Sequence, residues 1–281
     1  MRQARRGHPR RSQFVPTFGA AVAGDTPPDV VSLDLIYPPA FAAAHDLTDV
    51  TALTHKLPYF STFNPAQIRL ATYQGKLYGV PFSAGGSVLM YNKGLFRQAG
   101  LNPDDPPRTW SAIEKDARAI TALGASIYGF SFPAGCSGCN AYTLLPLIWA
   151  SGGDVLTRNG RTATLASSPP VKGALTFYHR LWTERVIPPS VRTDDWTTGF
   201  MNGAVGIIEG SPNFFPSAIS ALGDSNFGVA YVPGMSGGWS SFIGTYDADA
   251  GGPPPRVMCQ RRSLPVAGYE WLVHSLPVLS I

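Results

Sequence analysis

Residues 73–93 read YQGKLYGVPFSAGGSVLMYNK, and this stretch decides how the fold is interpreted. Its short apolar runs predict one strand over Gly75–Phe82 and a second over Ser87–Tyr91. Between them, Ser83-Ala84-Gly85-Gly86 carries almost no side-chain bulk, so the backbone there can rotate easily. The stretch therefore predicts two strands joined by a flexible link.

On both sides of this link, predicted strands alternate with predicted helices. Thr109 is expected to cap a helix in which Ile113, Ala117, Ile120 and Leu123 share one apolar face. Further strands are predicted at residues 29–33, 128–132, 204–208 and 227–232, and further helices at 38–44, 92–100, 144–152 and 171–182. This alternation is typical of α/β lobes with mainly parallel sheets.

Several motifs follow one another in a set order. The pattern G-K-L-Y-G-V-P within residues 73–82 is followed by L-M-Y-N-K-G-L-F and then by P-R-T-W. Three more stretches agree with it in order and spacing: TPPDVVSLDLIY at 26–37, LPLIWASGGDVL at 145–156 and FMNGAVGIIEGSPNF at 200–214. Over residues 14–244, this set resembles the family-1 extracellular solute-binding proteins, which are the sugar and glycerol-phosphate receptors of ABC importers.

The resemblance implies a two-lobed periplasmic-binding-protein-like α/β fold, incomplete at both ends, with ligand held in a hinge-closing cleft. The first lobe would comprise residues 14–84 and 236–246, and the second residues 87–232. Residues 1–13 are expected to be a disordered basic leader, and 247–281 an atypical tail. Because residues 245–251 can be back-translated and read one base later as TTLMPAG, we hypothesise a frameshift near Gly244.

The resemblance also implies which residues contact a carbohydrate. Such a site needs polar groups for the sugar hydroxyls and aromatic platforms for the C–H faces. Most candidates follow predicted strands or lie in the two crossings between the lobes. They are Asp34, Tyr37, Ser83, Asn140, Ser211, Asn213, Trp239 and Gly244. Other roles stay open: Asp34 suits a helix cap, Tyr37 a Tyr-Pro-Pro turn, Ser83 mere flexibility and Trp239 the core.

Charge and cysteine content favour no other class of protein. Removing the five arginines of residues 1–11 from the formal net charge of +4 leaves −1, so nucleic acid is not an expected partner. Cys136 and Cys139 form a lone CxxC, which lacks the second ligand pair of a structural zinc site. Its place after a predicted strand partly fits a redox motif, and a short-range loop disulfide fits as well. No apolar run has the roughly 20 residues of a membrane span. Since no secretory signal follows the arginines, the chain as written would stay in the cytosol, whereas the resemblance implies an extracytoplasmic location.

No catalytic pattern stands out in the sequence. Gly234–Gly238 has the G-x-S-x-G spacing, but it follows a predicted strand into a glycine-rich turn rather than a helix. A glycosidase would need two opposed carboxylates, which the sequence does not reveal. We therefore expect a monomeric carrier, with neither cofactor nor metal, that delivers carbohydrate to an ABC permease. The alternatives are a carbohydrate-active hydrolase and a non-functional fragment of a sugar-binding protein.

Overall fold

The structure is a computed structural model that describes residues 14–33, 36–81, 85–134, 139–157, 161–189, 196–241 and 243–244. For residues 14, 15, 140, 243 and 244 it describes the backbone alone. The chain divides into two compact units, one formed by Met1–Ser83 with Asp249–Ile281 and the other by Ala84–Ala248. The leader at 1–13 and the tail at 247–281 lie outside the described residues.

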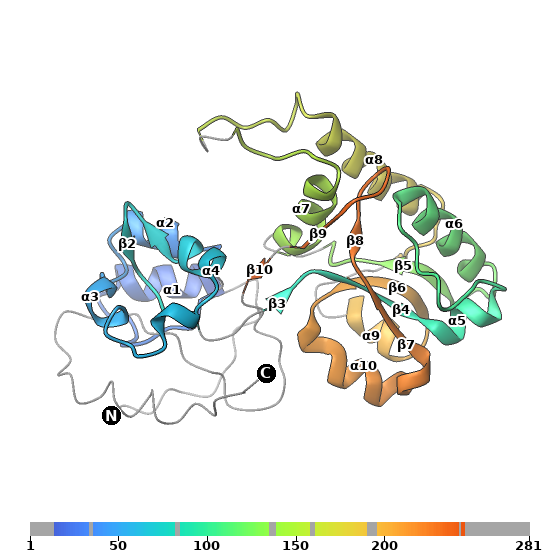
Figure 1. The fold of residues 1–281 in the computed structure, drawn as a ribbon, viewed down its shortest axis with the longest axis horizontal. Helices are drawn as coiled ribbons and strands as arrows, with labels where there is room; N and C mark the ends of the chain where they lie inside the picture. The colour runs from blue at the N-terminus through green and yellow to red at the C-terminus, as the bar shows by residue number, and fades with distance from the viewer. Residues whose placement is uncertain are drawn as a thin grey trace. The chain divides into compact units, whose positions relative to one another are not determined.

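The first unit is mainly helical in its described part (Figure 1). Its helices are α1 (Phe14–Ala23), α2 (Pro38–Ala43), α3 (Thr51–Thr54), η2 (Phe60–Thr62) and α4 (Pro65–Leu70). A hairpin follows, in which β1 (Thr72–Tyr73) pairs antiparallel with β2 (Lys76–Leu77). The hairpin turns through Gln74 and Gly75, both with positive φ, a conformation that favours glycine.

Two strands predicted for this unit are wrong in type or length. Val31 and Leu33 are buried with Phe18 in an apolar cluster, but residues 31–33 have no strand assignment. The strand expected over residues 75–82 is reduced to the two residues of β2. In both cases the apolar pattern correctly predicted that the residues are buried, but burial alone does not distinguish a strand from an extended loop.

The second unit is built on a sheet with strand order β5-β6-β4-β7 (Figure 1). These strands are β4 (Val88–Asn92), β5 (Tyr128–Ser131), β6 (Val205–Gly210) and β7 (Phe227–Ala230). Only β5 and β6 form a parallel pair, whereas β4 is antiparallel to both β6 and β7. The expectation of mainly parallel sheets is thus wrong here, because β4 enters the sheet directly from the preceding extended chain without a helical crossover.

Helices cover both faces of this sheet (Figure 1). On one side lie α6 (Trp110–Thr121), α7 (Asn140–Ala150) and α8 (Pro169–Thr183), and on the other α9 (Trp196–Met201) and α10 (Phe215–Leu222). The short helix α5 (Lys93–Gln98) directly follows β4. In the larger core cluster Trp110 stacks on Phe177 with ring centroids 5.4 Å apart. Each such buried side chain contributes about 1.5–3 kcal/mol, so this cluster dominates the stability of the second unit.

The sequence signals for α6 are confirmed. The Thr109 hydroxyl oxygen accepts a hydrogen bond from the Ala112 amide at 3.2 Å, which caps the first turn. Ile113, Ala117 and Ile120 are buried, but Leu123 lies beyond the last helical residue and is partly exposed. The helices α5, α7 and α8 and the strands β4, β5, β6 and β7 also occur within a few residues of their predicted positions, whereas α9 and α10 were not predicted.

The last described part of the chain forms two short ladders in the second unit. The strands β8 (Val232–Pro233) and β9 (Trp239–Ser240) form a hairpin that packs on α7. The strand β10 (Ile243–Gly244) then pairs antiparallel with β3 (Gly85–Gly86). Residues 236–246 were assigned to the first lobe from the sequence, but the described part of this stretch groups with the second unit.

Candidate ligand-binding site

The parallel strands β5 and β6 place a set of polar side chains at one end of the second unit. Both strands end there, at Ser131 and Gly210, and their pairing brings Ser131 opposite Ile208. In open α/β sheets, ligands bind beyond the carboxyl ends of such strands. The β4–β6 pairing ends with Val88 opposite Gly210. Ser87, which precedes β4, and Ser211, which follows β6, therefore lie at the same end of the sheet.

Two predicted residues, Ser211 and Asn213, lie directly after β6. Ser211 is 1% exposed, and its hydroxyl accepts a hydrogen bond from the Asn213 amide at the start of η3 (Pro212–Phe214). The Asn213 side chain is half-buried. Ser211 therefore shapes the turn, while Asn213 is the more accessible of the two.

The first turn of α7 reaches the same end of the sheet. Asn140 is the first residue of this helix, and only its backbone is described. The Ser87 hydroxyl donates a 2.5 Å hydrogen bond to the carbonyl oxygen of Tyr142, which ties the first turn of α7 to the entry of β4. This hydrogen bond brings the start of α7 close to the chain that enters and leaves β4 and β6.

Glu209, a buried carboxyl group, is the penultimate residue of the otherwise apolar strand β6. The side chain has no exposed surface, and the Tyr178 hydroxyl of α8 donates to its Oε2 over 2.5 Å. Burial raises the pKa of Glu209 to about 8, and the hydrogen bond from Tyr178 opposes this rise only in part. Glu209 is therefore neutral at pH 7.

Tyr178 is itself held firmly in place. Its ring stacks on Phe132 with centroids 4.1 Å apart and an interplanar angle of 7°. Burial, followed by the neighbouring Glu209, raises the pKa of Tyr178 well above its ordinary value, while a hydrogen bond with Thr143 acts in the opposite direction. Thr143 lies on α7 and is buried. Hydroxyl groups, one carboxyl group and aromatic rings thus gather at the end of the sheet beneath α7 and α8.

Two buried side-chain polar atoms in the described part of the chain have no hydrogen-bond partner. They are Oε1 of Glu209 and Oγ of Ser131. Because Ser131 pairs with Ile208, and Glu209 is the next residue along β6, the two side chains point to opposite faces of the sheet. Glu209 faces α7 and α8, where the other polar groups lie.

Glu209, Tyr178 and Thr143 were not among the residues predicted from the sequence. Within AVGIIEG, an acid inside an otherwise apolar strand was the signal, because a buried carboxyl group needs a partner. Tyr178 shares its helical face with Val171, Ala174 and Leu181, so the pattern marked it as core only.

The other predicted residues are placed as follows. Asp34 and Ser83 lie outside the described residues. Tyr37 precedes α2 in the first unit and packs half-buried against Phe41, with ring centroids 6.5 Å apart. Gly244 lies in β10 opposite Gly85 of β3.

Trp239 is on the surface of the second unit rather than in its core. It is 63% exposed and stacks on Tyr231, itself 65% exposed, with ring centroids 4.6 Å apart. Of the two roles considered for Trp239, the core role is therefore wrong. An exposed, pre-stacked aromatic pair has the form of a platform for an apolar C–H face.

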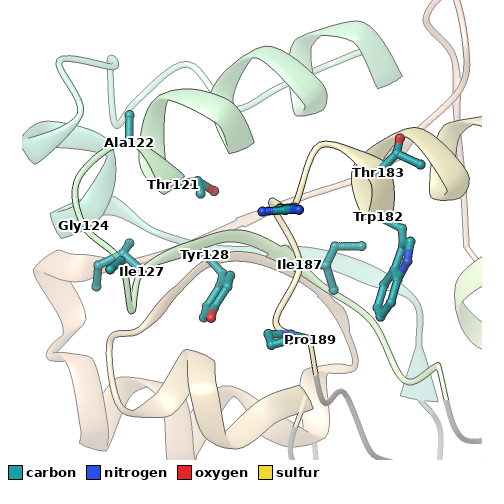
Figure 2. A pocket seen from close by; sticks show the side chains of 11 residues that line it. Thr121, Ala122, Gly124, Ile127, Tyr128, Trp182, Thr183, Ile187 and Pro189 are labelled. Atoms are coloured by element: carbon teal, nitrogen blue, oxygen red, sulfur yellow. The ribbon is translucent and has the colours of Figure 1, made fainter.

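Figure 2 shows a cavity at the opposite end of β5. Its volume is about 860 Å³, and its lining includes Tyr128 at the start of β5, Thr121 of α6 and Trp182 of α8. Ile127, Ile187 and Pro189 make much of its wall apolar (Figure 2). None of the residues predicted to bind ligand lines it. We therefore place the candidate site at the carboxyl ends of β5 and β6.

The described part of the chain was compared with the patterns expected of a metal site, a catalytic elbow, a disulfide and a membrane helix. It holds no group of three or more His, Cys, Asp or Glu side chains suited to a metal ion. Gly234–Gly238 forms the turn between β8 and β9, not a strand-to-helix elbow. Cys139 is disulfide-bonded. In the described ranges, no helix has the length and apolar character needed to cross a membrane.

Comparison with known proteins shows which family this chain resembles in sequence and fold. Among curated proteins, the sn-glycerol-3-phosphate-binding periplasmic protein UgpB of Yersinia enterocolitica is 27% identical over 260 residues, which cover 80% of this chain and 52% of UgpB. This chain thus spans about half the length of the curated relatives it matches.

Two solved structures resemble this chain closely. An ABC transporter solute-binding protein of Thermotoga lettingae bound to α-D-tagatose gives a TM-score of 0.80 at 25% identity, covering 93% of this chain and 65% of that one. Maltose-bound MalE3 of T. maritima gives 0.75 at 27% identity, covering 93% and 64%. These neighbours support the two-lobed α/β fold class. The family model for the bacterial extracellular solute-binding protein matches residues 17–251, so the chain belongs to that family.

Proposed function

We propose that this chain binds a carbohydrate or a related polyol and delivers it to the membrane permease of an ABC importer. The observation that carries the proposal is its likeness to two solute-binding proteins that were solved with tagatose and maltose bound. Hydroxyl groups and exposed aromatic rings in the second unit are the groups that sugar recognition requires.

The proposed ligand contacts are the residues predicted from the sequence. In the second unit they are Asn140, Ser211, Asn213, Trp239 and Gly244; in the first they are Asp34, Tyr37 and Ser83. Ser211 acts mainly by shaping the turn that presents Asn213, since its hydroxyl already accepts a backbone hydrogen bond.

Binding is proposed to occur without turnover, outside the cytoplasm and by a monomer that does not bind nucleic acid. Members of this family are solute-binding proteins rather than enzymes. The disulfide at Cys139 supports an extracytoplasmic location, because disulfides persist in oxidising compartments.

Titration calorimetry of the full chain against maltose, D-tagatose, ribitol and sn-glycerol 3-phosphate tests this function. We expect saturable binding of at least one of them, with the ligand recovered unchanged by chromatography. Release of reducing sugar from an oligosaccharide would instead favour a carbohydrate-active hydrolase. Failure to bind any of the four would contradict the proposed function and favour a non-functional fragment.

A further inference from the structure

Glu209 presents an unusual chemical state at the candidate site. Its Oε1 is buried and has no partner among the described residues, although a buried polar atom normally has one. Glu209 is two residues before Ser211 in the sequence, and its side chain lies on the face of the sheet that packs against Tyr178 and Thr143. A bound molecule at this end of β6 is the natural partner for it.

The surroundings of Glu209 decide whether the carboxyl group is charged. From α8 it meets Tyr178, and from β4 its ladder partner Leu89; Thr143 of α7 is uncharged and hydrogen-bonds Tyr178. Phe132, which follows β5, stacks on the Tyr178 ring. His179 and Arg180 come next on α8, but both are exposed. Tyr178 is thus the one titratable group facing Glu209 in the described part of the second unit.

The position of the proton follows from the hydrogen bond with Tyr178. Oε2 accepts the Tyr178 hydroxyl proton, so the proton of a neutral carboxyl group belongs on Oε1. A burial-raised pKa of about 8 supports this neutral form at pH 7. Oε1–H is then a hydrogen-bond donor that has no acceptor.

We propose that Glu209 binds the ligand as a neutral carboxyl group, donating from Oε1 to a ligand oxygen, and thereby selects uncharged hydroxyl-bearing carbohydrates over phosphorylated polyols. This inference rests on the proposed function and deepens it. The described hydrogen bonds at this end of the sheet join hydroxyl, carboxyl and backbone groups, and no lysine or arginine that could balance a phosphate takes part in them. Ionisation of Glu209 would remove the donor and place a negative charge beside the ligand.

The test is the pH dependence of affinity for whichever neutral carbohydrate binds in the calorimetric panel. If only the neutral carboxyl group binds, wild-type affinity falls about tenfold between about pH 7 and pH 9. Glu209→Gln keeps an uncharged donor and an acceptor, so its affinity should stay flat over this range. Tyr178→Phe removes the hydrogen bond that lowers the Glu209 pKa, so its midpoint should shift upward.

A second measurement needs no variant. Wild-type titrations at about pH 8.5 in two buffers of different ionisation enthalpy should show that a proton is taken up when ligand binds. Binding that is independent of pH, without proton uptake, would overturn the role of Glu209 while leaving the proposed function intact; a buried water on Oε1 gives this result. Tighter binding of sn-glycerol 3-phosphate than of every neutral carbohydrate would also overturn it. No binding of any compound would instead refute the proposed function itself.

Discussion

At the scale of single residues, the second unit holds two features suited to carbohydrate: a buried carboxyl group and a pair of exposed aromatic rings. Glu209 is fully buried beside Tyr178, whereas Trp239 and Tyr231 stack on each other at the surface. Burying a carboxyl group costs free energy unless it is neutral and hydrogen-bonded, and only one of its two oxygens has a partner. Such a residue weakens the fold in the absence of ligand, which makes its effect on stability measurable.

The stability of the second unit should decrease as the pH rises from about 5 to 8. The folded-state pKa of Glu209 is raised from 4.5 to about 8, so the folded state holds a proton that the unfolded state releases in this window. The contribution of Glu209 to stability is therefore greatest below its unfolded-state pKa of 4.5 and is lost as the pH rises toward its folded-state pKa of about 8. The free energy of unfolding falls by at most about 1.4 kcal/mol per pH unit in this window. Urea unfolding of the wild type and Glu209→Gln at several pH values measures this. Equal slopes for the two proteins would show that Glu209 is already ionised.

Replacing Trp239 with alanine should weaken carbohydrate binding by about tenfold, because the sugar loses an aromatic platform. Trp182→Ala is the matched control, since Trp182 is 51% exposed and lines the cavity in Figure 2 rather than the candidate site. Calorimetry compares both variants with the wild type. A loss of affinity in Trp182→Ala alone would move the ligand to that cavity.

At the scale of secondary structure elements, close packing of α6 holds β5 in place. Gly129 of β5 passes so close to α6 that an added Cβ would lie 2.0 Å from the Ala117 carbonyl oxygen. Glycine is required there because backbone cannot move aside as a side chain can. The sequence gives no hint of this contact, which depends on where α6 crosses the sheet.

Gly129→Ala should therefore destabilise the second unit by about 1–3 kcal/mol. Gly124→Ala is the control: its Cβ would have one neighbour within 4 Å, the Ile127 side chain at 3.8 Å. Thermal unfolding followed by circular dichroism measures both changes. Equal melting temperatures for Gly129→Ala and the wild type would contradict the packing of α6 on β5.

At the scale of the whole molecule, local signals predicted the elements better than their pairing. The Thr109 cap and the periodic face of α6 are local, and they were predicted correctly. The reversed direction of β4 and the loop at residues 31–33 depend on which strands lie nearby, which periodicity does not encode. For the candidate site, the strand-end rule predicted Ser211 and Asn213, and both lie directly after β6. Glu209 and Tyr178 were missed because their contact joins residues 31 positions apart on a strand and a helix.

The location of the bound carbohydrate is the central claim, and hydrogen–deuterium exchange of the full chain tests it most directly. The chain is compared with and without a saturating amount of the carbohydrate that binds most tightly in the calorimetric panel. We predict slower exchange on binding in residues 139–144 and 209–213, which surround the carboxyl ends of β5 and β6. Slower exchange confined to residues 121–128 and 182–189, which line the cavity in Figure 2, would contradict this account.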